Sequence, residues 1–118
     1  WHGQDPTEIS SVKAFENSVF AATKLYPDIA ENVMSTAFSH IFQGGYSAGY
    51  YSYKWAEVLD ADAFEYFLEK GIFHKEVATK FKDNVLSKGG TEKPMELYKR
   101  FRGKEPKPNA LLKRAGLL

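Results

Sequence analysis

The sequence predicts an all-α chain, and three observations support this fold class. Apolar residues recur at spacings of three and four in several segments, as they do along one face of an α-helix. Residues typical of helix starts and stops, among them Asp5-Pro6 and Gly71, stand at the ends of these segments. No segment alternates apolar and polar residues as a half-buried strand does. The chain has 118 residues, of which 43% are hydrophobic, so it is long enough to bury one core.

The boundaries of the expected helices follow from the apolar stripes and from helix-breaking residues. One stripe starts at Ile9, and Pro27 is expected to stop it near Leu25 because proline cannot continue a helix. Gly44-Gly45 and Gly89-Gly90 interrupt the pattern, since each glycine costs a helix about 1 kcal/mol relative to alanine. The expected helices span residues 7–25, 28–38, 48–69, 75–87, 92–102 and 109–115, with a Gly-rich loop over 39–47.

Composition and charge exclude several classes of protein. The chain has no cysteine, which excludes disulfides and thiolate metal sites. No apolar run approaches the roughly 20 residues that span a bilayer, so no membrane partner is expected. Residues 91–118 carry eight Lys and Arg against three Glu. Such a basic region can bind nucleic acid. Because the cations follow amphipathic patterns and often stand late in a helix, we favour a role in helix stability and expect no nucleic-acid partner.

The histidines do not form a recognisable metal site. A zinc peptidase helix needs two histidines at i and i+4 with a glutamate between them. His2, His40 and His74 are far apart in the sequence, and none has this partner. His74 is expected to lie on the surface at a helix N-terminus. The sequence therefore assigns no metal ligand to this chain.

A tyrosine-rich segment follows the first glycine pair. If a helix begins near Tyr46, then Tyr46, Tyr50 and Tyr53 lie at i, i+4 and i+7 on one face, six residues or more beyond His40. A row of phenol hydroxyls can donate hydrogen bonds to carbonyl oxygens or to a developing oxyanion. The Gly44-Gly45 pair would let the loop move over a bound ligand. The alternative is that these tyrosines are half-buried core residues with their hydroxyls in water.

The same segment resembles a known family. Residues 38–59 read Phe-Ser-His-Ile-Phe-x-Gly-Gly-Tyr-x-Ala-Gly-Tyr-Tyr-Ser-Tyr-x-Trp-Ala-Glu-Val-Leu, and residues 101–106 read Phe-Arg-Gly-Lys-Glu-Pro. These motifs are similar to those of the thimet oligopeptidase family of zinc metallopeptidases. The resemblance covers essentially the whole chain. It implies that residues 1–118 are the C-terminal helical portion of a larger α-helical catalytic domain.

The resemblance also implies an activity and a role for the tyrosine-rich segment. Such enzymes hydrolyse short unfolded peptides in a deep channel, and their zinc is held by a His-Glu-x-x-His helix and a further Glu upstream of the segment seen here. By this resemblance His40 and Tyr46 contact the substrate backbone near the scissile bond, and Tyr50 also contacts substrate. Tyr53 would donate its hydroxyl to the tetrahedral oxyanion alongside zinc. Gly44 and Gly45 would give the loop its hinge.

The resemblance leads to several expectations about cofactor, partners and location, and one alternative stands against it. Zinc belongs to the intact enzyme and none is expected on this segment, so the chain alone should be inactive. Its expected partners are short peptides and the remainder of the catalytic domain, and a fragment with exposed apolar faces could form a dimer. The expected location is the cytoplasm. The alternative is a non-catalytic helical peptide-binding module. The choice between an endo-acting oligopeptidase and a peptidyl-dipeptidase stays open.

Overall fold

The computed structural model describes all residues from Trp1 to Leu118 and is helical without strands, which confirms the predicted fold class. The chain divides into two compact units, residues 1–51 and residues 52–118, called here the N-terminal unit and the C-terminal unit. No helix is both long enough and apolar enough to cross a bilayer.

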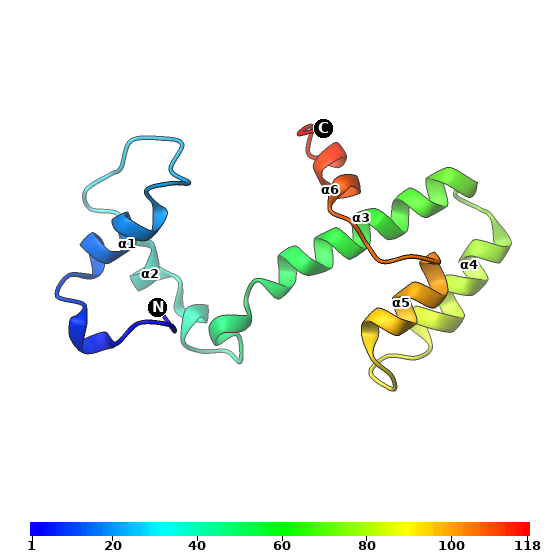
Figure 1. The fold of residues 1–118 in the computed structure, drawn as a ribbon, viewed down its shortest axis with the longest axis horizontal. Helices are drawn as coiled ribbons and strands as arrows, with labels where there is room; N and C mark the ends of the chain where they lie inside the picture. Colours follow the sequence, from blue (N-terminus) through cyan, green and yellow to red (C-terminus); the bar gives the residue numbers. More distant parts are fainter. The chain divides into compact units, whose positions relative to one another are not determined.

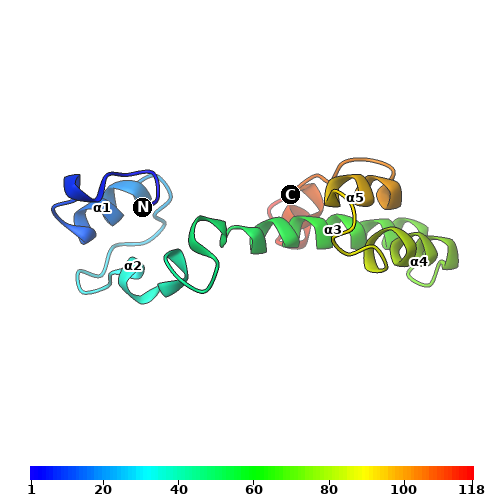
Figure 2. The same ribbon diagram turned by 90° about the horizontal axis from the view of Figure 1, so that it is seen from below.

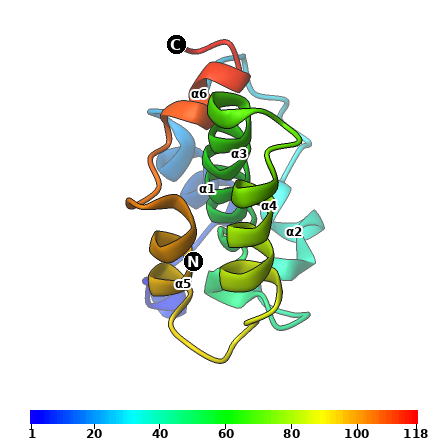
Figure 3. The same ribbon diagram turned by 90° about the vertical axis from the view of Figure 1, so that its right-hand side faces the viewer.

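The C-terminal unit is built on one long helix. α3 (Ser52–Lys70) is followed by α4 (Lys75–Phe81), a π-helical turn over Lys82–Leu86, α5 (Pro94–Arg102) and α6 (Asn109–Arg114). Figures 1 and 3 show α4 and α5 side by side, with α6 against α3. Figure 2 shows α3 running as one continuous helix alongside this group.

Glycines in the left-handed region end two of these helices. Gly71 has φ +107° and donates its N–H to the carbonyl of Phe67 at 2.8 Å, as expected for a residue just beyond a helix end. Gly103 has φ +81° and donates to the carbonyl of Lys99 at 2.7 Å, which closes α5. A side chain at either position would strain the backbone. These two glycines therefore set where the chain leaves α3 and α5.

The core of the C-terminal unit lies where α3, α4 and α5 meet. Phe101 is 1% exposed, and the rings of Tyr66, Phe67 and Phe81 surround it at centroid distances of 5.6, 6.2 and 5.1 Å. The remaining buried members of this core are Ala63, Val77 and Tyr98. Aromatic side chains contribute most of the buried surface here, so the packing depends on a few large residues.

A buried charge network joins α5 to α3 beside this core. The Arg102 guanidinium donates to Asp62 at 3.2 Å and to both oxygens of Glu69 at 3.1 and 3.3 Å, and it lies 4.7 Å from the Tyr66 ring centroid. The Tyr98 hydroxyl donates to Asp62 at 2.6 Å. Burial and this bond to Asp62 raise the pKa of Tyr98, so it stays protonated and acts as a donor. The network therefore fixes the register of α5 along α3.

Other cations of the basic region also pair with carboxylates. Lys113 lies 3.2 Å from Glu65, and Arg114 lies 2.7 Å from Asp60, so both join α6 to α3. Lys99 lies 2.8 Å from Glu105. These contacts tie the basic residues to carboxylates of α3 and of the segment after α5.

The N-terminal unit has short helices and long turns. It contains a 3-10 turn over Pro6–Glu8, α1 (Val12–Phe20), α2 (Met34–Ala37), and 3-10 turns over Ser39–Ile41 and Ser47–Gly49. No apolar side chain in this unit is buried, and its one buried residue is Glu16, which is 6% exposed. Lys13 ties the segment after α1 to that helix through Asp28 at 2.9 Å and through the carbonyls of Ile29 and Asn32.

The expected helices 7–25 and 28–38 are wrong in their extent. The first is interrupted because the Ser11 hydroxyl accepts the Ala14 N–H at 3.2 Å and starts α1 there. It ends at Phe20, where Thr23 turns back onto the Phe20 carbonyl, well before Pro27. Of the second only the turn Met34–Ala37 is helical.

The expected helix 48–69 begins later than predicted, at Ser52. Gly49 ends a 3-10 turn directly before α3, and glycine lowers the preference of this stretch for an α-helix. Expected helix 75–87 is α-helical to Phe81 and then widens into the π-helical turn. Expected helix 92–102 begins two residues late because Pro94 takes the first helical position. Expected helix 109–115 agrees with α6 to within one residue.

Candidate functional site

The tyrosine-rich segment forms a tight turn closed by two glycines. Gly44 and Gly45 have φ values of +72° and +74°, a left-handed conformation that glycine adopts without strain. A Cβ built on Gly44 would lie 3.4 Å from the Tyr46 ring and 3.6 Å from the His40 ring. The backbone at Gly44 therefore passes close to both rings, and the turn places His40 next to Tyr46.

Four rings gather around this turn and are called here the aromatic cluster: Phe38, His40, Tyr46 and Tyr50. The His40 ring lies 5.2 Å from the Tyr46 ring and 5.4 Å from the Tyr50 ring, measured between centroids. Tyr46 and Tyr50 lie 5.5 Å apart with an interplanar angle of 68°. Three residues singled out from the sequence thus contact one another, and the edge-to-face geometry is the one aromatic pairs prefer.

Phe38 is the member of the cluster that the sequence analysis did not identify as part of the site. Its ring meets Tyr50 edge-on at 4.5 Å and 90°, and it lies 5.7 Å from His40. Phe38 immediately follows α2, and its N–H donates to the Met34 carbonyl at 2.9 Å. It therefore connects the aromatic cluster to that helix. The sequence signal was its position two residues before His40 in the family-like motif.

Tyr46, Tyr50 and Tyr53 do not share one α-helical face as predicted. Tyr46 precedes the 3-10 turn Ser47–Gly49, Tyr50 follows it, and the α-helix starts only at Ser52. The i, i+4, i+7 spacing is therefore not realised on a continuous helix, because the turn around Gly49 intervenes. Tyr53 belongs to the first turn of α3 in the C-terminal unit and is 51% exposed. Trp55, in the same turn of α3, is 49% exposed.

The residues of the aromatic cluster that were singled out from the sequence are partly exposed. His40 and Tyr46 are half-buried, and Tyr50 is 36% exposed. His2, which the sequence gave no role here, donates from Nε2 to the Ile41 carbonyl at 2.5 Å and packs on Phe42 at 5.2 Å. The N-terminal segment thus borders the loop that carries His40.

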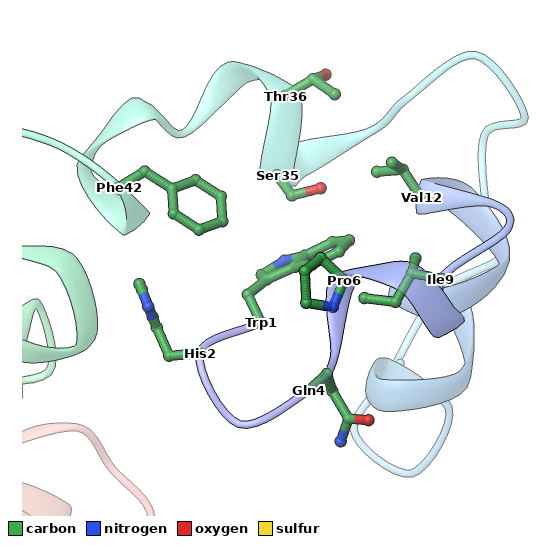
Figure 4. A pocket seen from close by; sticks show the side chains of 9 residues that line it. All are labelled: Trp1, His2, Gln4, Pro6, Ile9, Val12, Ser35, Thr36 and Phe42. Carbon is green, nitrogen blue, oxygen red and sulfur yellow. The ribbon is translucent and has the colours of Figure 1, made fainter.

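An apolar cavity of about 460 Å³ lies within the N-terminal unit and is lined in part by Phe42 of this loop. Figure 4 shows the Trp1 indole in its centre, Phe42 and His2 along one side, and Ser35 pointing inward while Thr36 points away. The other lining residues are Gln4, Pro6, Ile9 and Val12.

The chain offers no cluster of metal ligands. No group of three or more His, Asp or Glu side chains lies close enough together to hold an ion, and the chain has no cysteine. His74 instead caps α4, where its Nδ1 accepts the Val77 N–H at 3.4 Å, on the surface as predicted. The residues of this chain therefore do not fit a zinc site.

Comparison with known proteins identifies the family of this chain. The sequence model of peptidase family M3 matches residues 2–117. The chain therefore belongs to peptidase family M3, which confirms the resemblance found in the sequence.

Individual relatives support this assignment. The chain is 62% identical over 81 residues to oligopeptidase A of Escherichia coli strain K12, an alignment that covers 69% of this chain and 12% of that protein. It is 42% identical over 117 residues to a probable cytosolic oligopeptidase A of Arabidopsis thaliana, covering 96% and 17%. It is 37% identical over 119 residues to dipeptidyl carboxypeptidase of Escherichia coli strain K12, covering 99% and 18%. The chain thus spans less than a fifth of the length of these curated relatives.

Proposed function

We propose that this chain is the C-terminal portion of the catalytic domain of a metallopeptidase that hydrolyses short unfolded peptides. The observation that carries the proposal is the contact of His40, Tyr46 and Tyr50 on the diglycine turn, in a chain that the family model matches almost throughout. The names of the relatives, oligopeptidase and dipeptidyl carboxypeptidase, support a peptide substrate. Zinc is proposed for the intact enzyme, with ligands outside this chain.

The proposed roles follow from the chemistry of the side chains. Tyr46, Tyr50 and His40 carry hydrogen-bonding groups on rings that contact one another, which suits recognition of the carbonyl and N–H groups of an extended peptide. Gly44 and Gly45 allow backbone to approach that peptide closely and act as the hinge of the loop. Tyr53 donates its hydroxyl to the oxygen on which negative charge develops when the scissile carbonyl is attacked.

The alternative is a non-catalytic peptide-binding module. It uses the same aromatic cluster but predicts peptide affinity without turnover in the full-length protein. The 460 Å³ cavity and the many exposed apolar side chains, such as Phe42 and Phe73, are compatible with either role. We further propose a cytoplasmic location, which the name of the Arabidopsis relative supports.

The test of the catalytic proposal is substitution of Tyr53 in the full-length protein. Tyr53→Phe removes only the hydroxyl and is expected to lower kcat by about 10²-fold, as for loss of one oxyanion donor. Tyr51→Phe is the matched control, because Tyr51 is 74% exposed and has no proposed role. Steady-state hydrolysis of a quenched fluorescent peptide measures both. A kcat for Tyr53→Phe within threefold of wild type contradicts the proposal.

A second assay tests whether the chain needs the rest of its domain. The isolated 118-residue chain with added zinc is expected to release no product from the quenched peptide, because a donor to an oxyanion is useless without a nucleophile. Turnover that a chelator abolishes would show that the segment contains its own catalytic metal site.

A further inference from the structure

Glu16 is the one buried residue of the N-terminal unit, and its carboxylate faces α2. Its Oε1 accepts the Met34 N–H at 2.8 Å. Its Oε2 accepts both the Ser35 N–H at 3.1 Å and the Ser35 hydroxyl at 2.5 Å. A carboxylate buried among three donors is satisfied only while those donors stay in place, so Glu16 and α2 hold each other.

α2 depends on this contact more than an ordinary helix would. It has only four residues, and a single helical turn is unstable by itself in water. Val33, which precedes it, supplies no side-chain cap. Glu16, 18 residues earlier in the chain, therefore satisfies the N–H groups that a local capping residue would otherwise bind.

The end of α2 leads directly into the aromatic cluster. Phe38 closes α2 through its N–H bond to Met34 and places its ring edge-on against Tyr50. The Phe38 carbonyl then accepts the Ile41 N–H at 3.3 Å, which begins the 3-10 turn that carries His40. A shift of α2 would therefore move both Phe38 and the backbone of His40.

We propose that Glu16 is a positioning residue: through Met34, Ser35 and the turn α2 it holds Phe38 and His40 where they complete the aromatic cluster that binds peptide. This inference rests on the proposed function for its catalytic consequence. Its structural part, the coupling of Glu16 to residues 38–50, does not depend on the proposed function and can be measured without an activity assay.

The experiment compares Glu16→Gln with Glu31→Gln in the full-length protein. Glu16→Gln keeps the shape of the side chain but turns an amide N–H₂ toward backbone N–H donors, so at least one of the three bonds is lost. Glu31→Gln removes the same charge from an exposed residue between α1 and α2. Hydrogen exchange, followed by mass spectrometry, is expected to be faster in Glu16→Gln over residues 34–50 and unchanged over 62–102. Faster exchange confined to 33–37, or none, overturns the coupling.

The kinetic arm separates positioning from a general loss of structure. Glu16→Gln is expected to lower kcat/KM for a short peptide about tenfold, as for one lost hydrogen bond to a charged group. In a His40→Ala background the further loss from Glu16→Gln is expected to fall below threefold, since the group it positions is already absent. An undiminished tenfold loss in that background overturns the proposal.

The two proposals fail in different ways. If His40→Ala and Tyr53→Phe both leave hydrolysis unchanged, the proposed function is wrong. The hydrogen-exchange experiment then still tests the structural coupling of Glu16 to residues 38–50, because it does not depend on activity. If those variants reduce activity and Glu16→Gln does not, the proposed function survives and the positioning role of Glu16 is wrong.

Discussion

Different kinds of interaction stabilise the interior of each of the two units. The C-terminal unit buries apolar side chains around Phe101 and adds a buried ion pair, whereas the N-terminal unit buries no apolar side chain and depends on Glu16 and on ring contacts. Burial of apolar surface is the main source of folding free energy. The C-terminal unit, called here the scaffold, thus has an apolar core of its own, whereas His40, Tyr46 and Tyr50 lie in the N-terminal unit on segments with few buried apolar contacts, which lowers local stability.

The largest expected effect of a single substitution is on the scaffold. Phe101→Ala removes a ring that is 1% exposed and contacts four other rings, so it should lower the free energy of unfolding by about 3–5 kcal/mol. Urea denaturation measures this change. Phe73→Ala, at a side chain that is 98% exposed, is the control and is expected to change stability by less than about 0.5 kcal/mol. Equal effects for the two variants would show that the aromatic core is wrongly identified.

The next largest effect concerns the buried ion pair. Arg102→Met leaves Asp62 buried without its cation and should cost about 3 kcal/mol. Arg100→Met, two residues earlier in α5, removes an exposed pair with Glu92 and should cost less than about 1 kcal/mol. Thermal and urea unfolding of both variants give the comparison. If Arg102→Met lowers the free energy of unfolding no more than Arg100→Met does, the buried charge network does not stabilise the C-terminal unit.

The smallest expected effect is a pH dependence in the N-terminal unit. The bond from the Ser35 hydroxyl, aided by the N–H groups of Ser35 and Met34 and by Lys13 on α1, lowers the pKa of Glu16 from its ordinary value of 4.5, against the opposing effect of burial. Glu16 therefore contributes its full stabilisation above about pH 4.5, and this is lost as the pH falls through its lower folded-state pKa.

The measurement is the difference in free energy of unfolding between wild type and Glu16→Gln at several pH values. This difference is expected to be constant from pH 5 to 7 and to shrink below that range, since the protonated acid resembles the amide. A difference that is the same at pH 3 and at pH 7 would show that the carboxylate charge is not what holds α2.

The sequence predicted the fold class because the fold class depends on local patterns. Apolar spacing indicated the helices, and the position of Gly71 indicated the end of α3. The grouping of His40 with two tyrosines was expected from a resemblance, but the predicted geometry of a continuous helix was wrong because Gly49 directs the chain into a 3-10 turn. Their roles toward a substrate stay predictions.

The interactions that the sequence did not predict join residues far apart in the chain. Glu16 binds Ser35 across 19 residues, and Arg102 binds Asp62 across 40. A single sequence shows Glu16 only as a polar residue within an amphipathic stripe, and nothing in helical spacing indicates that α2 will present its N–H groups to it. Such contacts depend on which distant segments the turns bring next to each other, and local sequence patterns do not specify this.

The most direct test of the central claim, that this segment binds peptide through the aromatic cluster, is hydrogen exchange of the full-length protein with and without a non-cleavable peptide analogue. Bound peptide is expected to slow exchange over residues 38–53 and to leave residues 62–102 in the scaffold unchanged. Unchanged exchange over 38–53 while the analogue is bound would contradict the claim and place peptide recognition elsewhere.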